Sequence, residues 1–152
     1  MRRFTLFFFA LFAFLMAGAQ SSLPDFSTED NPTYYPIKFK QGGAYLGDQG
    51  AGNKMLTVAS TGDATQYQLI GTQSSFILKS KLGNYVTFNS SSSRFTTTAT
   101  QSEAVKLKII NGSADKYYEL QRVGQSNCMN QFGGQGAGKE LGEWEVGDIG
   151  NQ

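Results

Sequence analysis

The chain has 152 residues, a length that fits one ordinary domain and leaves little room for a separate cofactor-binding domain. Its 13 basic and 12 acidic residues give no basic surplus, which argues against a nucleic-acid partner. It contains no histidine, so it lacks the usual general base, the most common zinc ligand and any Ser-His-Asp or Cys-His arrangement. We therefore expect no metal site, no cofactor and no enzymatic activity.

The first 19 residues have the three parts of a secretory signal peptide. Arg2 and Arg3 form a basic start, an apolar run follows over residues 4–16, and Ala17-Gly18-Ala19 supplies the small residues that a signal peptidase reads. The apolar run is shorter than the roughly 20 residues that span a bilayer, which favours cleavage before Gln20 over a retained anchor. We expect a mature chain without a membrane segment, either secreted or held in the periplasm or at the cell surface.

Residues 20–33 show no apolar alternation, and we expect them to form a flexible leader. Beyond them, short alternating runs are separated by Gly, Asn, Ser and Asp. In the clearest run, Val105, Leu107 and Ile109 share one face and the two lysines between them share the other. No helical periodicity competes with this pattern. The sequence therefore predicts an all-β domain over residues 34–152.

A motif of about 40 residues occurs three times. The opening strands start at Tyr35, Phe76 and Tyr118, which are 41 and 42 residues apart. A glycine turn and a second strand follow each opening, so that Tyr45 and Tyr85 occupy matching positions. Third strands are predicted at 55–58, 95–98 and 144–146, and fourth strands at 66–70 and 105–110. Three four-stranded units, over about 34–72, 73–113 and 114–152, predict a β-trefoil, in which each unit buries its apolar face against the other two.

The third unit lacks room for its fourth strand. In units one and two the fourth strand follows the third by 11 and 12 residues, which would place the matching residue of unit three near position 155, after Gln152. We expect this closing strand to be missing or very short, which leaves a sheet edge unpaired. Either the sequence is the front piece of a longer protein, for example one with a C-terminal catalytic domain, or a strand from a partner chain completes the sheet.

Four segments carry a family resemblance: Tyr-Pro-Ile-Lys-Phe at 35–39, Gly-Thr-Gln at 71–73, Met-Asn-Gln-Phe-Gly-Gly at 129–134 and Gly-Ala-Gly-Lys-Glu-Leu-Gly-Glu-Trp at 136–144. Together they resemble the ricin-type β-trefoil lectin-like domain found N-terminally in secreted carbohydrate-active proteins of Bacteroidetes-type bacteria. The resemblance implies a non-catalytic module that binds a glycan or polysaccharide. The chain departs from the Gln-x-Trp of such lectins, because Tyr67 and Leu107 stand at the tryptophan positions. We expect both to be core residues.

Two groups of residues are candidates for a sugar site, which needs an aromatic face and a few polar groups. The resemblance implies a hydroxyl acceptor at Asp48, and Gln49 and Asn53 follow it in a glycine-rich loop. Asp48 also fits a turn residue that satisfies backbone N–H groups. The second group is Asn130, Gln131 and Trp144. Trp144 is either an exposed stacking platform or, as is more usual at an inward strand position, a core anchor.

Two further features have structural interpretations. The glycine-rich loop at 49–54 recurs at 135–139, which indicates repeated backbone geometry rather than phosphate binding. The single cysteine, Cys128, is expected to be a buried thiol. Two functions therefore remain: a secreted carbohydrate-binding module, or a structural or protein-interaction module with vestigial sugar sites.

Overall fold

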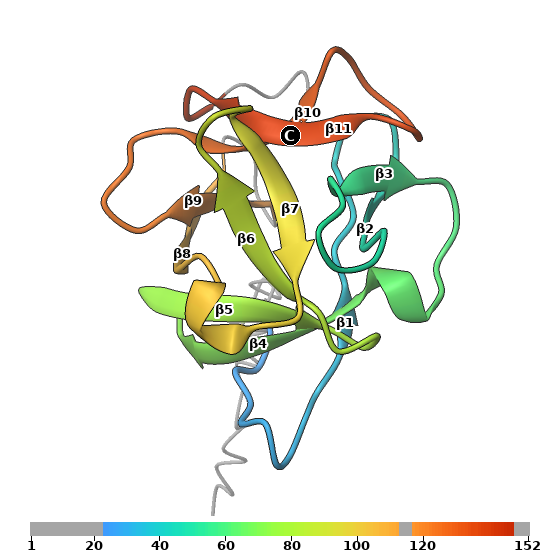
Figure 1. The fold of residues 1–152 in the computed structure, drawn as a ribbon. Coiled ribbons are helices and arrows are strands. Elements are labelled where there is room, and N and C mark those ends of the chain that lie inside the picture. The colour runs from blue at the N-terminus through green and yellow to red at the C-terminus, as the bar shows by residue number, and fades with distance from the viewer. Residues whose placement is uncertain (1–22, 113–116, 148–152) are drawn as a thin grey trace, which may run out of the picture.

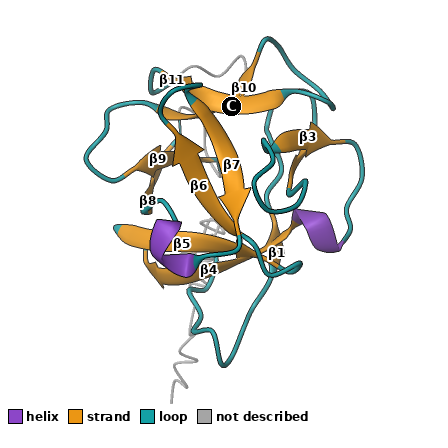
Figure 2. Cartoon of the chain, viewed as in Figure 1, coloured by secondary structure: helices purple, strands orange, loops and turns teal. Residues whose placement is uncertain are grey.

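The computed structural model describes residues 23–112 and 117–147 (Figure 1). The predicted signal peptide and the first residues of the leader lie outside this part of the chain. Within it, the chain consists of strands and loops with two short 3-10 helices, η1 (Asp63–Thr65) and η2 (Gln101–Glu103) (Figure 2). None of the helices in the described ranges is long and apolar enough to cross a membrane.

The strands of the described residues form one barrel-like antiparallel sheet, which confirms the all-β prediction. In chain order they are β1 (Tyr35–Pro36), β2 (Tyr45–Gly47), β3 (Leu56–Val58), β4 (Gln66–Thr72), β5 (Ser75–Ser80), β6 (Tyr85–Asn89), β7 (Arg94–Thr98), β8 (Leu107–Asn111), β9 (Tyr118–Arg122), β10 (Cys128–Phe132) and β11 (Glu140–Trp144). The order in the sheet is β1-β4-β5-β8-β9-β10-β11-β3-β2, and the β6–β7 hairpin joins it through β5.

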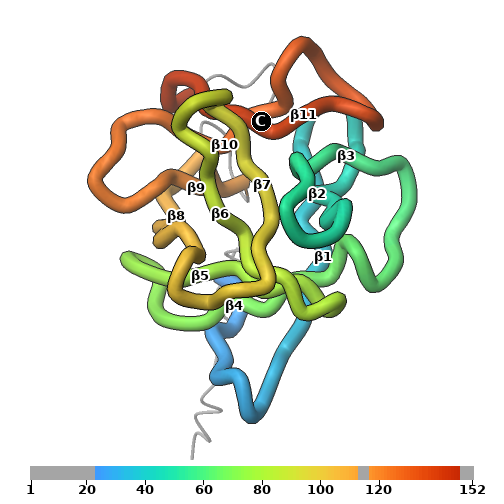
Figure 3. Tube along the Cα trace, viewed as in Figure 1, coloured from blue at the N-terminus to red at the C-terminus, as the bar shows by residue number. Residues whose placement is uncertain are grey.

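Three hairpins, β2–β3, β6–β7 and β10–β11, are built on this sheet (Figure 3). Tyr45 pairs with Val58 and Tyr85 pairs with Thr98, so the two tyrosines hold matching places. In the third hairpin the sequence prediction was wrong about the second strand. That strand ends at Trp144 instead of beginning there, because Phe132 pairs with Glu140 and the glycine-rich loop between them closes the hairpin early.

The core consists of the inward residues of the alternating strands. Tyr67 and Leu107, which replace the expected tryptophans, are both 0% exposed, as predicted. Phe76, Leu78 and Phe95 are buried beside them in the same cluster. Burying a large apolar side chain contributes about 1.5–3 kcal/mol, so alternation in these short strands supplies much of the driving force for folding.

The described part of the leader packs on the sheet rather than standing apart from it. The backbone N–H of Ser27 donates to the carbonyl of Leu69 on β4 at 2.9 Å. The ring of Phe26 meets Phe76 edge-on at 5.5 Å between centroids, and Glu29 accepts hydrogen bonds from Lys79 and Tyr85. Two separated side chains, Phe26 and Glu29, rather than a periodic pattern, attach this stretch to the sheet.

The sheet is interrupted between β1 and β9. Among the described residues, β1 pairs with β4, and β9 pairs with β8 and β10, but no strand joins β1 to β9. The predicted end of the third unit, at residues 148–152, lies outside the described part of the chain.

Candidate functional site

The structure separates the six predicted site residues by exposure. Three are buried: Asp48 at 3% exposed, Asn130 at 5% and Gln131 at 0%. The other three, Gln49, Asn53 and Trp144, are exposed. The first group does not form one cluster with the second, because Asp48 turns toward the β5–β6 hairpin whereas Asn130, Gln131 and Trp144 lie on β10 and β11.

Asp48 organises the loop that follows β2. Its carboxylate accepts hydrogen bonds from the backbone N–H of Gly50 at 2.8 Å, from the Ser80 hydroxyl and from the Asn84 amide at 2.9 Å. These three donors occupy both carboxylate oxygens inside the fold. The arrangement matches the turn-residue alternative and extends it, because two of the donors come from another part of the chain.

Gln49 and Asn53 lie in the exposed loop next to Asp48. The Asn53 side-chain amide donates to the carbonyl of Gln49 at 2.9 Å, which closes the loop on itself. No aromatic side chain in this loop offers a stacking face. The group therefore provides polar atoms without the apolar surface that a sugar ring requires.

Gln131 joins two loops. Its amide nitrogen donates to the carbonyl of Gln41 at 3.0 Å, and its amide oxygen accepts from the backbone N–H of Gly136 at 3.0 Å. The loops approach closely at Gly42, where a Cβ atom would lie 2.4 Å from the Gly136 nitrogen and φ is +72°. Gln131 is therefore a structural bridge whose amide is already engaged.

Asn130 and Trp144 lie on the same face of the β10–β11 hairpin. Asn130 pairs with Gly142, and Trp144 pairs with Cys128, so all four lie on one face by strand alternation. Trp144 is 54% exposed, which contradicts the core-anchor interpretation and leaves the stacking-platform one. The core-anchor interpretation failed because Trp144 ends its strand, past the point where the sheet covers it.

The amide of Asn130 adds an unusual feature to this face. Its Nδ2 is buried and has no hydrogen-bond partner among the described residues. Buried polar atoms without a partner are rare in folded proteins, and each one indicates strain, a water or a ligand. The second such atom in the described ranges is Oε2 of Glu119 on β9.

Glu119 belongs to the same region. Cys128 on β10 pairs with Gln121 on the antiparallel strand β9. Asn130 and Glu119 each lie two residues from that pair, in the same direction, and therefore share one face of the sheet. The other carboxylate oxygen of Glu119 accepts from the backbone N–H of Gly147 at 3.0 Å. Sequence reasoning missed Glu119, although a carboxylate between Tyr118 and Leu120 in a strand was a detectable signal.

Cys128 lies on this same face, opposite Trp144, as a buried thiol, as predicted. Burial raises its pKa to about 12, and the neighbouring Glu119 carboxylate raises the pKa further in the same direction. The thiol is therefore protonated at neutral pH, which makes it a poor nucleophile.

A second exposed aromatic on the hairpin, Phe132, is already stacked. The guanidinium of Arg94 lies 3.3 Å from the Phe132 ring centroid and also binds Glu140, with 2.9 Å between Arg94 Nε and Glu140 Oε2. Trp144 has no such cation or ring partner among the described residues, so its faces are available to a ligand. The described residues contain no group of three or more His, Cys, Asp or Glu side chains that could hold a metal ion.

Comparison with known proteins relates the chain to a solved structure by its fold. No family model matches the chain, and no curated protein matches its sequence. The structure is similar to that of a ricin B-like lectin from Macrolepiota procera in complex with lactose, with a TM-score of 0.66. The alignment covers 81% of this chain and 91% of that one, at 14% sequence identity. At this identity the likeness concerns the fold alone, and the chain has the fold of a ricin B-like lectin.

Proposed function

We propose that the chain is a carbohydrate-binding module whose sugar site is the face of the β10–β11 hairpin that carries Trp144 and Asn130. One observation carries the proposal. Trp144 is 54% exposed and unstacked among the described residues, and it shares its face with Asn130, whose buried Nδ2 has no partner there. A platform beside an unsatisfied donor is the combination that a sugar requires.

The chemistry of a pyranose fits these groups. Its apolar face stacks on the indole ring of Trp144, since aromatic rings present large apolar surfaces of fixed geometry. A sugar hydroxyl both donates and accepts, so it can accept from Asn130 Nδ2 and donate to Glu119 Oε2. The lectin of similar fold was solved with lactose, which makes lactose the first ligand to test.

The wider proposal rests on the sequence. The threefold repeat supports a β-trefoil, and residues 1–19 support an exported chain that is cleaved before Gln20. The absence of histidine supports a module without catalytic function, which would act beside a glycan-degrading enzyme as in the resembling bacterial proteins.

The alternative, a structural or interaction module, is favoured for unit one by a specific observation. The Asp48 carboxylate is occupied by three internal donors, so a sugar hydroxyl has no free carboxylate there. We therefore propose one live site, in unit three, and no sugar site at Asp48.

The test measures binding of the chain from Gln20 onward to lactose and to a panel of plant and host glycans by calorimetry and glycan array. Trp144→Ala should weaken binding at least ten-fold, and Asn130→Ala should weaken it as well. Tyr117→Ala is the matched control, because Tyr117 is 46% exposed and lies just before β9, outside the β10–β11 hairpin. Retained affinity in Trp144→Ala, or no binding to any glycan by the unmodified chain, would contradict the proposal.

A further inference from the structure

A lysine lies over the ring of a tyrosine at two matching places, one beside β2 and one beside β6. Lys38 pairs with Tyr45, and Lys38 Nζ lies 5.5 Å from the centroid of the Tyr45 ring. Lys79 on β5 pairs with Tyr85 on β6, and the corresponding distance is 5.1 Å. The same arrangement of an ammonium group and a phenol therefore occurs twice, with the lysine and the tyrosine on neighbouring antiparallel strands.

The pair beside β6 binds a carboxylate from the leader. Glu29 Oε1 accepts a hydrogen bond from the Tyr85 hydroxyl at 2.6 Å and another from Lys79 Nζ at 3.0 Å. The hydrogen bond from Tyr85, and then the one from Lys79, hold the pKa of Glu29 below its ordinary value of 4.5, because both favour the ionised carboxylate. This part of the chain therefore shows what such a lysine–tyrosine pair takes as its ligand.

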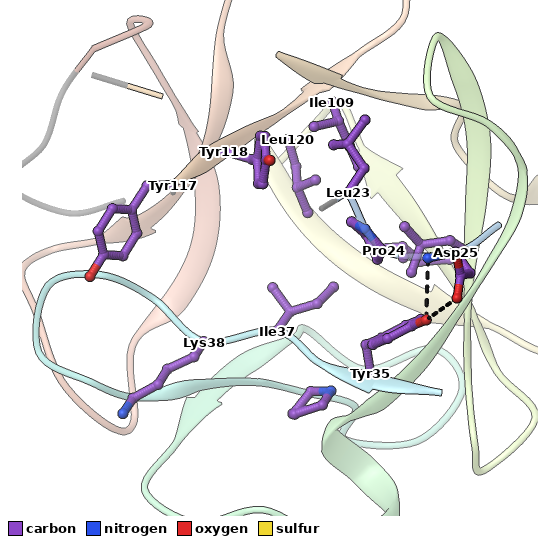
Figure 4. A pocket seen from close by; sticks show the side chains of 13 residues that line it. Leu23, Pro24, Asp25, Tyr35, Ile37, Lys38, Ile109, Tyr117, Tyr118 and Leu120 are labelled. Carbon is purple, nitrogen blue, oxygen red and sulfur yellow. Dashed lines mark hydrogen bonds between the residues drawn. The ribbon is translucent and has the colours of Figure 1, made fainter. Parts of the chain in front are cut away.

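The pair beside β2 is open. Lys38 is exposed and Tyr45 is half-buried, whereas Tyr85, to which Glu29 binds, is only 6% exposed. In the described ranges, Lys38 Nζ forms no ion pair and the Tyr45 hydroxyl forms no hydrogen bond. Figure 4, a view into the neighbouring pocket, shows Ile37 pointing toward Leu120 while Lys38 extends the other way. The ammonium and the phenol beside β2 are therefore accessible to a carboxylate from outside the chain.

The backbone around Tyr45 limits the kind of ligand. Tyr45 pairs with Val58 on one side and with Lys38 on the other, so β2 offers no free edge there to an added peptide strand. A ligand must therefore be held by side chains. An acidic peptide brings its carboxylate on a flexible side chain, whereas a uronic acid carries it on a rigid sugar ring and loses less conformational entropy on binding. The choice of a sugar rests on the proposed carbohydrate-binding function.

We propose that Lys38 and Tyr45 form a subsite for the carboxylate of a uronic acid residue in an acidic polysaccharide. The carboxylate accepts hydrogen bonds from Lys38 Nζ and from the Tyr45 hydroxyl, as Glu29 does beside β6. The contact of Lys38 with the Tyr45 ring holds the ammonium in place before the ligand binds. The subsite is additional to the one stacking site proposed above, which lies on the β10–β11 hairpin.

The test follows the amide signals of the chain from Gln20 onward by two-dimensional NMR. Methyl β-glucuronide is the probe, and methyl β-glucoside, which has the same ring without the carboxylate, is the comparison. The glucuronide should shift the signals of Lys38 and Tyr45 saturably and bind at least about ten-fold more tightly than the glucoside, since hydrogen bonds to a charged group are worth about 1.5–3 kcal/mol. The amide of N-acetylglutamate, a probe for an acidic peptide, should bind more weakly than the glucuronide.

Protein variants locate the binding. Lys38→Ala, which removes the ammonium, and Tyr45→Phe, which removes only the hydroxyl, should each weaken glucuronide binding. Lys106→Ala, at another exposed lysine, is the matched control and should leave it unchanged. Trp144→Ala should also leave it unchanged, so failure of the stacking site and failure of this subsite can be told apart. The NMR spectrum of each variant shows whether it is folded.

A variant of the leader gives an independent check. Glu29→Ala removes the carboxylate from Lys79 and Tyr85, while Phe26 and Ser27 still attach the leader to the sheet. In this variant the glucuronide should also shift the signals of Lys79 and Tyr85, which it should not do in the unmodified chain.

Three results would overturn the proposal. One is equal affinity for the glucuronide and the glucoside, and another is undiminished glucuronide affinity in Lys38→Ala. The third is binding of the N-acetylglutamate amide as tight as that of the glucuronide, since that would assign the subsite to an acidic peptide.

Discussion

Thr57 on β3 and Thr97 on β7 make the same hydrogen bonds to two different glycine-rich loops. The Thr57 hydroxyl donates to the carbonyl of Gly136, and the Thr97 hydroxyl donates to that of Gly50, both at 2.6 Å. The backbone of each threonine also bonds twice to its loop, at 2.7–2.8 Å for Thr57 and 2.7–3.1 Å for Thr97. The repeated Gln-Gly-Ala-Gly sequence is therefore a repeated joint between neighbouring units, as the prediction of shared backbone geometry implied.

Removing one of these hydroxyls should destabilise the protein. Thr57→Val keeps the side-chain shape but leaves the Gly136 carbonyl without its hydroxyl donor, which should lower the free energy of unfolding by about 1–3 kcal/mol. Thr97→Val should have a similar effect. Urea denaturation measures both, and Thr61→Val, at an exposed loop position, is the control that should change stability little. Equal stability of Thr57→Val and Thr61→Val would refute a structural role for the joint.

Asp48 and its neighbour Gln49 should differ sharply in their effect on stability. Asp48→Ala leaves the Ser80 hydroxyl and the Asn84 amide without their acceptor, which should cost about 1–3 kcal/mol of unfolding free energy. Gln49→Ala removes an exposed side chain and should stay within about 0.5 kcal/mol of the unmodified protein. Thermal and urea unfolding provide the measurement. Neither variant should lose affinity for a sugar. A loss of affinity in Asp48→Ala alone would show that unit one does carry a sugar site at Asp48.

Glu140 should make stability depend on acid pH. Lys54, and then Arg94, hold its pKa below the ordinary value of 4.5. A carboxylate whose pKa is lower in the folded state stabilises the protein above its unfolded-state pKa, and this contribution is lost as the pH falls through the folded-state pKa. The difference in Tm between the unmodified protein and Glu140→Gln should therefore be present at pH 7 and shrink below about pH 4.5. Asp30→Asn, at an exposed turn, is the control, and a pH-independent difference for Glu140→Gln would exclude the ionic cause.

Cys128 should resist thiol reagents while the protein is folded. Because its pKa is raised to about 12 and its side chain is 0% exposed, almost no accessible thiolate exists at pH 8. Modification by a chromogenic disulfide should be at least 100-fold slower in buffer than in 6 M guanidinium chloride, by the principle that thiolate fraction and access control the rate. Rapid stoichiometric reaction in buffer would show that the hairpin opens freely over β9.

The places of most strands along the chain could be predicted because they depend on local alternation and on repetition. Tyr67 and Leu107 were expected to be core residues because the resemblance places them at the tryptophan positions of ricin-type lectins, and both are fully buried. The third strand of unit three was misplaced because Glu143, Trp144, Glu145 and Val146 also alternate, and alternation alone does not set register. The pairing of Phe132 with Glu140 sets the register of this strand.

The candidate sites were predicted less well, since exposure depends on which distant segment covers a residue. Asp48 carries the residue type expected of a sugar ligand, but Ser80 and Asn84 cover it from another hairpin. Trp144 carries the residue type expected of a core anchor, but it lies beyond the covering strands. Glu119 became a candidate only in the tertiary structure, because the pairing of β10 with β9 brings it to the face that carries Asn130.

The amino-acid sequence by itself determined the class of this fold, its repeat and its principal core residues, because period-two alternation and recurrence are local properties of the chain. The tertiary structure alone decided which polar groups are satisfied, where the described part of the leader packs and which candidate residues are exposed. Those outcomes depend on contacts between residues far apart in sequence, and in short strands the register of such contacts is set by the assembled sheet rather than by any one segment.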